Sequence, residues 1–142
     1  IERNRTQTKA SEFLSGINFA RSEAIKRGVP VAVQAVGGNF QNGWCVLVNP
    51  APPGAPPAAC GAAPAAELRS FTATAANQMV VNAVVNRIVF DGRGFRATPG
   101  AGAGDVVISV QPADCTTGEA EGRRATTVLI SGRAEVSEED CL

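Results

Sequence analysis

The chain of 142 residues contains no histidine at all. Imidazole is the usual general base and a frequent metal ligand, so catalytic triads and zinc sites that need it are excluded. The chain also has no excess of charge, because 13 basic residues balance 13 acidic ones. A neutral chain has no overall attraction to nucleic acid or to anionic lipid. These absences predict a protein that is not an enzyme and that holds no cofactor or metal ion.

Long apolar runs are absent too. The sequence contains neither a signal peptide nor an apolar run long enough to span a membrane. It begins with Ile1 rather than with methionine, and we expect the natural protein to have a further segment before it. Hydrophobic residues nevertheless make up 44% of the chain, which is enough to bury one core.

The four cysteines, Cys45, Cys60, Cys115 and Cys141, lie far apart in the sequence. None of their spacings is the CxxC of zinc or thioredoxin-type sites, so two disulfides are favoured over the four free thiols of a cytosolic protein. Three pairings can be drawn from four cysteines. We favour Cys45–Cys60 with Cys115–Cys141, because each bridge would close a loop, and closing a loop of about 15 residues stabilises a fold by ~3 kcal/mol. Disulfides predict an exported protein.

Residues 1–28 are predicted to form one long helix. Apolar residues recur at helical spacing and define a stripe that should face the core. The stripe consists of Phe13, Leu14, Ile17, Ala24 and Ile25, together with Ala10 and Ala20. Gly28 and Pro30 then end the helix. Residues 2–9 are polar on every side, so they should gain nothing from a core and are predicted to continue a longer helix that begins upstream.

After the helix, the apolar period changes to two, which predicts β-strands. The expected strands span residues 31–36, 44–48, 68–73, 79–85, 87–90, 95–98, 105–111, 125–131 and 134–137. Residues 50–66 and 112–122 are predicted to be surface loops. Consecutive strands joined by short turns should pair antiparallel, with one face on the helix. The predicted fold class is therefore α+β, with one long N-terminal helix packed on antiparallel sheet.

Three groups of residues could carry chemistry, and each has a simpler explanation. Glu119 and Glu121 lie in a polar loop, where solvated carboxylates are favoured over an acid–base pair, which needs an apolar pocket. Residues 91–94 predict a hairpin turn and not a phosphate loop, because no helix with Lys and Ser or Thr follows them. Arginines gather in the second half of the chain and could bind DNA, but acidic residues lie among them.

Four segments resemble one protein family, in the order in which the family has them. Residues 19–28, followed by Val29-Pro30-Val31, are similar to the hallmark segment of the GspH/FimT group of type IV pilins and type II secretion pseudopilins. Gly43-Trp44 resembles the family's GW strand start, residues 88–94 its FxxxG hairpin, and residues 129–133 its closing GR strand. Within the group, minor pilins of the FimU type are the most similar.

The resemblance implies a structural role in a fibre. Residues 1–28 would be the C-terminal half of the pilin spine helix, and residues 29–142 the β-rich head that forms one domain with it. A hydrophobic N-terminal half, upstream of Ile1, would anchor the full-length protein in the inner membrane of a Gram-negative bacterium, with the head in the periplasm. The implied partners are other minor pilins and the major pilin, and the implied place is the pilus tip, where minor pilins prime assembly.

The same resemblance leaves two alternatives open. One is a minor pseudopilin of the H type in a type II secretion system. The other is a minor pilin that binds DNA for uptake through a C-terminal GRxR motif. The corresponding residues here are Gly132, Arg133, Ala134 and Glu135, so an acidic side chain replaces the second arginine. The sequence therefore disfavours nucleic acid as a partner and leaves Arg133 as a candidate for a weak DNA contact.

Overall fold

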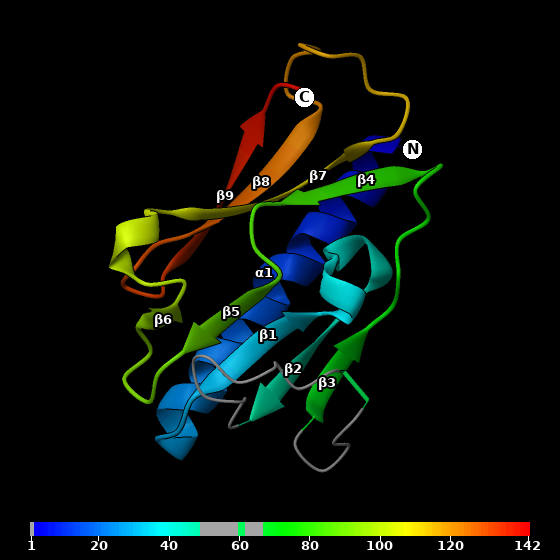
Figure 1. Cartoon of the computed structure of the whole chain (residues 1–142). Helices are drawn as coiled ribbons and strands as arrows, with labels where there is room; N and C mark the ends of the chain where they lie inside the picture. The colour runs from blue at the N-terminus through cyan, green and yellow to red at the C-terminus, as the bar shows by residue number, and fades with distance from the viewer. Residues whose placement is uncertain (1, 49–59, 62–66) are drawn as a thin grey trace.

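A computed structural model describes residues 2–48, 60–61 and 67–142 (Figure 1). It confirms the α+β class, with the helix α1 spanning Glu2–Arg27. The strands that follow are β1 (Val31–Ala35), β2 (Trp44–Val48), β3 (Glu67–Phe71), β4 (Met79–Ala83), β5 (Arg87–Phe90), β6 (Arg96–Thr98), β7 (Val106–Pro112), β8 (Arg123–Val128) and β9 (Ala134–Glu139). Short 3-10 turns, η1 (Val36–Gly38) and η2 (Phe40–Asn42), join β1 to β2. Ile1 and most of the loop predicted at 50–66 lie outside the described residues.

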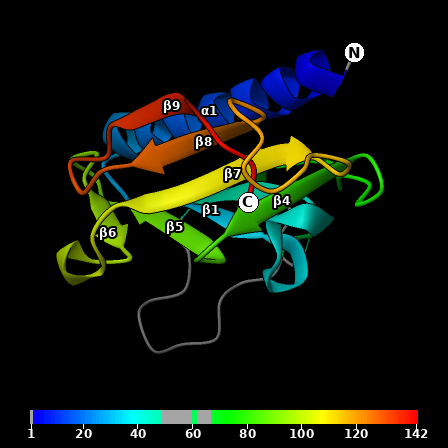
Figure 2. The same cartoon turned by 90° about the horizontal axis from the view of Figure 1, so that it is seen from above.

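The strands form two antiparallel sheets (Figures 1 and 2). The first sheet has the order β3-β2-β1-β5-β6, and the second has the order β4-β7-β8-β9. Five pairs of consecutive strands are hydrogen-bonded neighbours, as the sequence predicts: β1 with β2, β2 with β3, β5 with β6, β7 with β8, and β8 with β9.

The strand β4 departs from the predicted pairing of neighbours. It pairs with β7 rather than with β3 or β5. Residues 84–86 do not turn the chain back on itself but carry it from the second sheet to the first. The carbonyl of Asn86 accepts a hydrogen bond of 2.9 Å from the N–H of Ala35, which anchors this crossing at the end of β1. The strand β5 can then pair with β1, with Val33 opposite Ile88.

The helix runs along one face of both sheets (Figure 2). It contacts β1, β2 and β5 in the first sheet and β7, β8 and β9 in the second. Successive side chains of a strand point to opposite faces of the sheet, and in β7 Val106, Ile108 and Val110 belong to the core cluster, while Ser109 and Gln111 are buried as well. The helix therefore unites both sheets in one core. Among the described residues, no helix is long and apolar enough to cross a lipid bilayer.

The side chain of Gln41 joins the two sheets at the edge of β4. Its Oε1 accepts a hydrogen bond from the N–H of Val81 at 2.8 Å, and its Nε2 donates to the carbonyls of Thr74 and Met79 at 2.7 and 3.0 Å. Gln41 itself lies in η2, between two strands of the first sheet. Its amide therefore satisfies backbone groups that a partner strand would otherwise pair.

Candidate functional site: the helix and the turns at its end

The buried side of α1 has a heptad spacing. Residues separated alternately by four and three positions are buried, and we call them the inner seam. The inner seam consists of Thr6, Ala10, Phe13, Ile17, Ala20 and Ala24. The predicted stripe contributes Phe13, Ile17 and Ala24 to it, whereas Leu14 is half-buried. The prediction for Ile25 is wrong. Its side chain is 51% exposed, because it lies about 100° around the helix from Ala24.

The polar start of the helix takes more part in packing than expected. Thr6 is buried, and the Nζ of Lys9 lies 5.5 Å from the centre of the Trp44 ring while it pairs with Glu12 at 3.2 Å. A cation is attracted to the face of an aromatic ring. The expectation that residues 2–9 gain nothing from a core is therefore wrong for Thr6 and Lys9. Extending the heptad spacing back from Ala10 by four residues would have identified Thr6.

The helix packs on the first sheet through stacked aromatic rings. The rings of Phe13 and Trp44 have centres 3.9 Å apart, and Trp44 stacks in turn on Phe71 of β3 at 4.7 Å. Gly16 makes room for this stack, since a Cβ there would lie 3.1 Å from the Phe71 ring. Stacked rings add favourable interactions to their apolar burial. The tryptophan of the GW pair is therefore a contact between helix and sheet as well as the start of β2.

Arg21 attaches the turns of both sheets to the helix. Its Nε donates to the carbonyl of Gly94 at 2.9 Å, in the turn between β5 and β6. Its Nη2 donates to the carbonyl of Ser131 at 3.4 Å, in the turn between β8 and β9. Three of the four family-like segments of the sequence therefore meet at one guanidinium group.

The turns approach one another so closely that side chains cannot be accommodated. Gly94 and Gly132 have positive φ angles of 88° and 89°. A Cβ on Gly132 would overlap with the carbonyl oxygen of Gly94, and one on Gly92 would lie 2.8 Å from the backbone of Gly28 at the helix end. Only glycine combines this backbone conformation with such short approaches. Residues 91–94 form a turn, as the sequence predicts.

The outer side of α1 carries a second row of residues with heptad spacing, which we call the outer seam. Its members are separated by three and four positions, and all are exposed. They are Thr8, Ser11, Ser15, Asn18 and Ser22. All five side chains are small and uncharged. The solvent side of an ordinary surface helix carries charged residues, so the outer seam is unusual.

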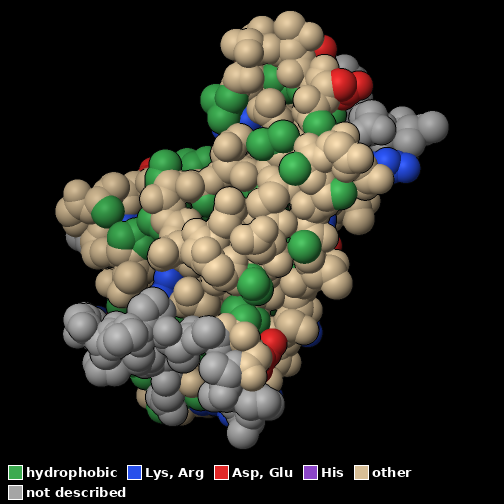
Figure 3. Space-filling view, turned by 45° about the vertical axis from the view of Figure 1, so that its right-hand side comes forward, with side chains coloured by type: hydrophobic (Ala, Val, Ile, Leu, Met, Phe, Trp, Pro, Cys, Tyr) green, Lys and Arg blue, Asp and Glu red, His purple; other side chains and the backbone are tan. Residues whose placement is uncertain are grey.

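Much of the head surface is uncharged as well. The described residues 28–48 and 70–86, which include β1, β2 and β4, contain no Lys, Arg, Asp or Glu. Figure 3 views the molecule from the side of β4 and the 3-10 turns, where few charged side chains are visible. Charged residues are concentrated on the helix and in the second half of the chain.

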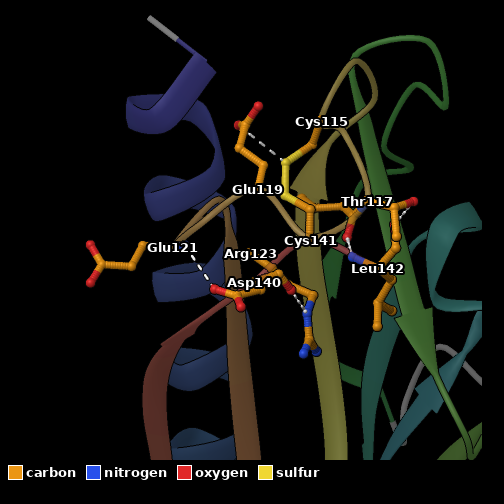
Figure 4. The surroundings of a disulfide bond; sticks show 9 residues. Cys115, Thr117, Glu119, Glu121, Arg123, Asp140, Cys141 and Leu142 are labelled. Atoms are coloured by element: carbon orange, nitrogen blue, oxygen red, sulfur yellow. Dashed lines mark hydrogen bonds between the residues drawn. A yellow bond between two sulfur atoms is a disulfide. The ribbon is translucent and has the colours of Figure 1, made fainter.

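Both predicted disulfides are present. The Cα atoms of Cys45 and Cys60 are 5.9 Å apart, and those of Cys115 and Cys141 are 6.2 Å apart. The second bridge fixes the C-terminal tail to the loop after β7 (Figure 4). Backbone hydrogen bonds support it, from Cys141 to the carbonyl of Glu119 at 3.0 Å and from Gly118 to the carbonyl of Cys141 at 2.8 Å. The tail and the loop thus form one unit at the end of the second sheet.

The residues considered for chemistry or DNA binding lie at the surface. Glu119 and Glu121 are exposed, and Glu121 points away from the disulfide, whereas a Glu119 oxygen lies 3.5 Å from the Sγ of Cys115 (Figure 4). Arg133 is also exposed and forms an ion pair with Glu135, the residue that stands in place of the second arginine of a GRxR motif. The guanidinium of Arg133 is therefore already paired with an acidic side chain.

One helix that packs through a heptad seam across two antiparallel sheets, with two disulfides in the head, defines a pilin-like fold. Two crystal structures of the type IV minor pilin FimU from Pseudomonas aeruginosa strain PAO1 share it. The first is 21% identical to the chain and covers 96% of it and 90% of the FimU chain, with a TM-score of 0.67. The second is 19% identical and covers 92% and 91%, with a TM-score of 0.63.

The family model described as type II transport protein GspH matches residues 9–132. The chain therefore belongs to the GspH family, in agreement with the resemblance of its sequence segments. The matched region includes Arg21 and both turns that this residue holds. No curated protein sequence matches the chain.

Proposed function

We propose that this chain is a minor pilin that acts by packing and not by catalysis. It would join other minor pilins and the major pilin in the tip complex that primes pilus assembly. Membership in the GspH family and the likeness of the fold to the FimU minor pilin support this proposal. The uncharged face around β4 would provide further contact surface between heads, because such a face loses no strongly hydrated charges when it is covered.

The observation that carries the proposal is the outer seam of α1. Small side chains allow two helix backbones to approach closely, and hydroxyl groups can form hydrogen bonds across the contact. A helix with one seam in its own head and another facing outward can pack on two sides at once. A subunit needs this property if its helix is to contact neighbouring helices inside a fibre.

The proposal includes a division of the chain and a location. Residues 1–28 would belong to the spine helix and residues 29–142 to the head, which together form one domain. A hydrophobic segment of about 20 residues upstream would hold the full-length protein in the inner membrane of a Gram-negative bacterium, with the head in the oxidising periplasm, until assembly moves it to the pilus tip. Sequencing the gene upstream of the Ile1 codon tests this, and a polar upstream segment would contradict it.

Two other functions have some support. The description of the family model, type II transport protein, favours a minor pseudopilin of the H type in a type II secretion system. DNA uptake has less support, because Glu135 is paired with the candidate contact Arg133. A gel-shift assay at physiological salt tests DNA binding, and binding that Arg133→Ala abolishes would favour uptake.

Deleting the gene in its native bacterium separates the pilus from secretion. We expect surface pili, counted by electron microscopy, to fall several-fold and to return when the full-length gene is supplied on a plasmid. Release of type II secretion substrates into the medium should not change. Normal piliation with impaired secretion would favour the pseudopilin, and no change in either process would contradict both functions.

A further inference from the structure

Three exposed apolar side chains lie where α1 meets the β5–β6 and β8–β9 turns. Ile25, Phe95 and Ile130 are 51%, 46% and 41% exposed, respectively, and we call them the helix-end patch. They come from segments in direct contact. A Cβ on Gly94 would lie 2.7 Å from the Cδ1 of Ile25, and the N–H of Arg96, beside Phe95, donates to the carbonyl of Ile130 at 3.0 Å. The three side chains thus belong to one area of the surface.

The backbone beneath the helix-end patch is fixed before any partner binds. Arg21 holds both turns against the helix, as described above. Within the β5–β6 turn, the Oδ1 of Asp91 accepts hydrogen bonds from the N–H groups of Arg93 and Phe95 at 2.9 and 3.1 Å. A preorganised surface loses little conformational entropy on binding. Partner binding at this surface therefore requires no folding of a loop.

The area around the patch is positively charged, although the whole chain is neutral. Residues 21–28, 91–96 and 129–135 contain six basic and three acidic side chains. The three acidic side chains pair with Arg27, Arg93 and Arg133, so the area keeps a net charge of +3. The Arg93 side chain is 80% exposed, with its guanidinium 5.2 Å from the centre of the Phe95 ring, and Lys26 is also exposed. Arg96 adds a buried charge whose hydrogen bonds go to backbone carbonyls. The patch has an apolar centre and a cationic rim.

The patch also continues the outer seam of α1. Ile25 follows Ser22, the last residue of that seam, by three positions, which is the next step of the heptad spacing. The two surfaces can therefore be covered by the same assembly. This continuity favours another fibre subunit as the molecule that covers the patch.

We propose that the helix-end patch binds a carboxylate-rich surface on the head of a neighbouring pilin subunit. This inference rests on the proposed function, because the neighbour is a subunit of the same fibre. Charge complementarity selects the partner's chemistry, since the cationic rim attracts an acidic surface and repels a basic one. The apolar side chains at the centre lose their contact with water when the heads meet.

Binding between purified heads tests the proposal. The head of this chain is immobilised, and the heads of the other minor pilins encoded by the same bacterium are passed over it in biolayer interferometry. We expect one head to bind, and Phe95→Ser or Ile130→Ser to weaken it by about tenfold, since each removes apolar contact area. The matched control is Leu142→Ser, because Leu142 is 58% exposed in the C-terminal tail, outside both the patch and the uncharged face around β4, and it should leave the affinity within about twofold.

The electrostatic part has its own measurement. Raising NaCl from about 50 to about 300 mM should slow association of the unmodified head, because salt screens the rim. Arg93→Glu should remove most of this salt dependence, whereas Arg69→Glu, on the edge strand β3, should retain it. Thermal melting verifies folding, and Lys26→Glu at an exposed helix position replaces any turn variant that fails to fold.

Two results would overturn the inference. Binding of a partner head that is unchanged by the apolar variants and by Arg93→Glu would place the contact elsewhere. Self-association of this chain in analytical ultracentrifugation, lost in Phe95→Ser and without binding to another head, would make a second copy the occupant. Neither result affects the proposed function, which fails only if the gene deletion leaves piliation unchanged.

Discussion

Arg96 is buried, and its guanidinium donates hydrogen bonds to backbone carbonyls from two segments. The distances to the carbonyls of Val128 and Pro99 are 2.7 and 2.9 Å, and Gly100 and Gly104 accept further bonds. A buried charge is costly unless hydrogen bonds replace its contacts with water. Here carbonyl dipoles supply them, so one side chain ties residues 99–104 to the end of β8.

Replacing Arg96 by methionine should destabilise the fold by ~2–4 kcal/mol, because buried carbonyls lose their donors. Arg96→Lys should lose nearly as much, since an ammonium group cannot reach as many carbonyls as the planar fork of a guanidinium. Urea unfolding measures both variants. Arg93→Met removes a mostly exposed arginine and should change the free energy of unfolding by less than ~0.5 kcal/mol. Equal losses at both positions would contradict the role given to Arg96.

The carboxyl of Asp91 makes the stability of the fold at the β5–β6 turn depend on pH. Partial burial raises the pKa of Asp91, but hydrogen bonds from the N–H groups of Arg93 and Phe95, with the Arg93 guanidinium, outweigh it and hold the pKa below the ordinary value of 3.8. A group whose pKa is lower in the folded state stabilises the fold above its unfolded-state pKa. That stabilisation is lost as the pH falls from about 5 through 3.8 toward the folded-state pKa.

Asp91→Asn should therefore destabilise the protein at pH 6 and have a smaller effect at about pH 2.5, below the ordinary pKa of 3.8, where the stabilisation by the carboxylate is progressively lost. Asparagine keeps an oxygen that can accept the two backbone hydrogen bonds, so the variant removes mainly the charge. Urea unfolding at both pH values gives the comparison, with exposed Asp105→Asn as the control. A destabilisation by Asp91→Asn that does not vary with pH would show that the charge is not involved.

At the scale of elements, the side-chain amide of Gln41 helps to hold β4 in position. Gln41→Ala would leave the N–H of Val81 and the carbonyls of Thr74 and Met79 without this partner. We expect a loss of ~1–3 kcal/mol and faster hydrogen exchange of the Val81 amide, while amides of β7 and β8 change less. Gln78→Ala, at an exposed position of the preceding turn, is the control. Unchanged exchange at Val81 would contradict this account.

The contact between the two hairpin turns can be separated from backbone strain. Gly132 and Gly118 have similar positive φ angles, 89° and 84°. A Cβ on Gly118 would have nothing within 4 Å, whereas one on Gly132 would overlap with the carbonyl of Gly94. Gly118→Ala should therefore cost ~1 kcal/mol of strain. Gly132→Ala should cost ~2 kcal/mol more, because the turns must move apart. Thermal melting compares the two, and equal costs would contradict close packing of the turns.

Most strands could be predicted from sequence, because alternating side chains and tight turns are local signals. The turn at 91–94 and the alternation of 105–111 identified β5, β6 and β7 closely. The pairing of β4 was not predictable in this way. Residues 84–86 are as short as a hairpin turn, and what holds β4 beside β7 is the burial of Met79 and Val81 in the core together with Gln41, which is about 40 residues away.

The same limit applies to single residues of the site. The heptad spacing contained the information for Thr6, but its polarity concealed it. The guanidinium contacts of Arg21 and Arg96 join residues that are tens of positions apart, and neither side chain differs from a surface arginine in its local sequence. The family resemblance identified the segments that meet at Arg21, although not the hydrogen bonds that join them.

At the scale of the whole molecule, α1 has two separate tasks. The inner seam unites both sheets, so changes there should unfold the head. The residues of the outer seam are exposed and lie on the opposite side of the helix from the inner seam. Stability and assembly should therefore be separable by mutation. Ile17→Ala, in the inner seam, is expected to cost ~2–5 kcal/mol.

Ser15→Arg, in the outer seam, should leave the melting temperature of the head nearly unchanged, because arginine is a good helix former and its side chain can extend into solvent. In the full-length protein, it should prevent restoration of pili in the deletion strain, because a long charged side chain keeps a neighbouring helix from approaching. Piliation counts after complementation measure this, with Ser70→Arg on the edge strand β3 as the control for added charge. Suppose that Ser15→Arg restores normal piliation and that Ile17→Ala fails only because the head unfolds. The outer side of the helix would then not be a packing surface.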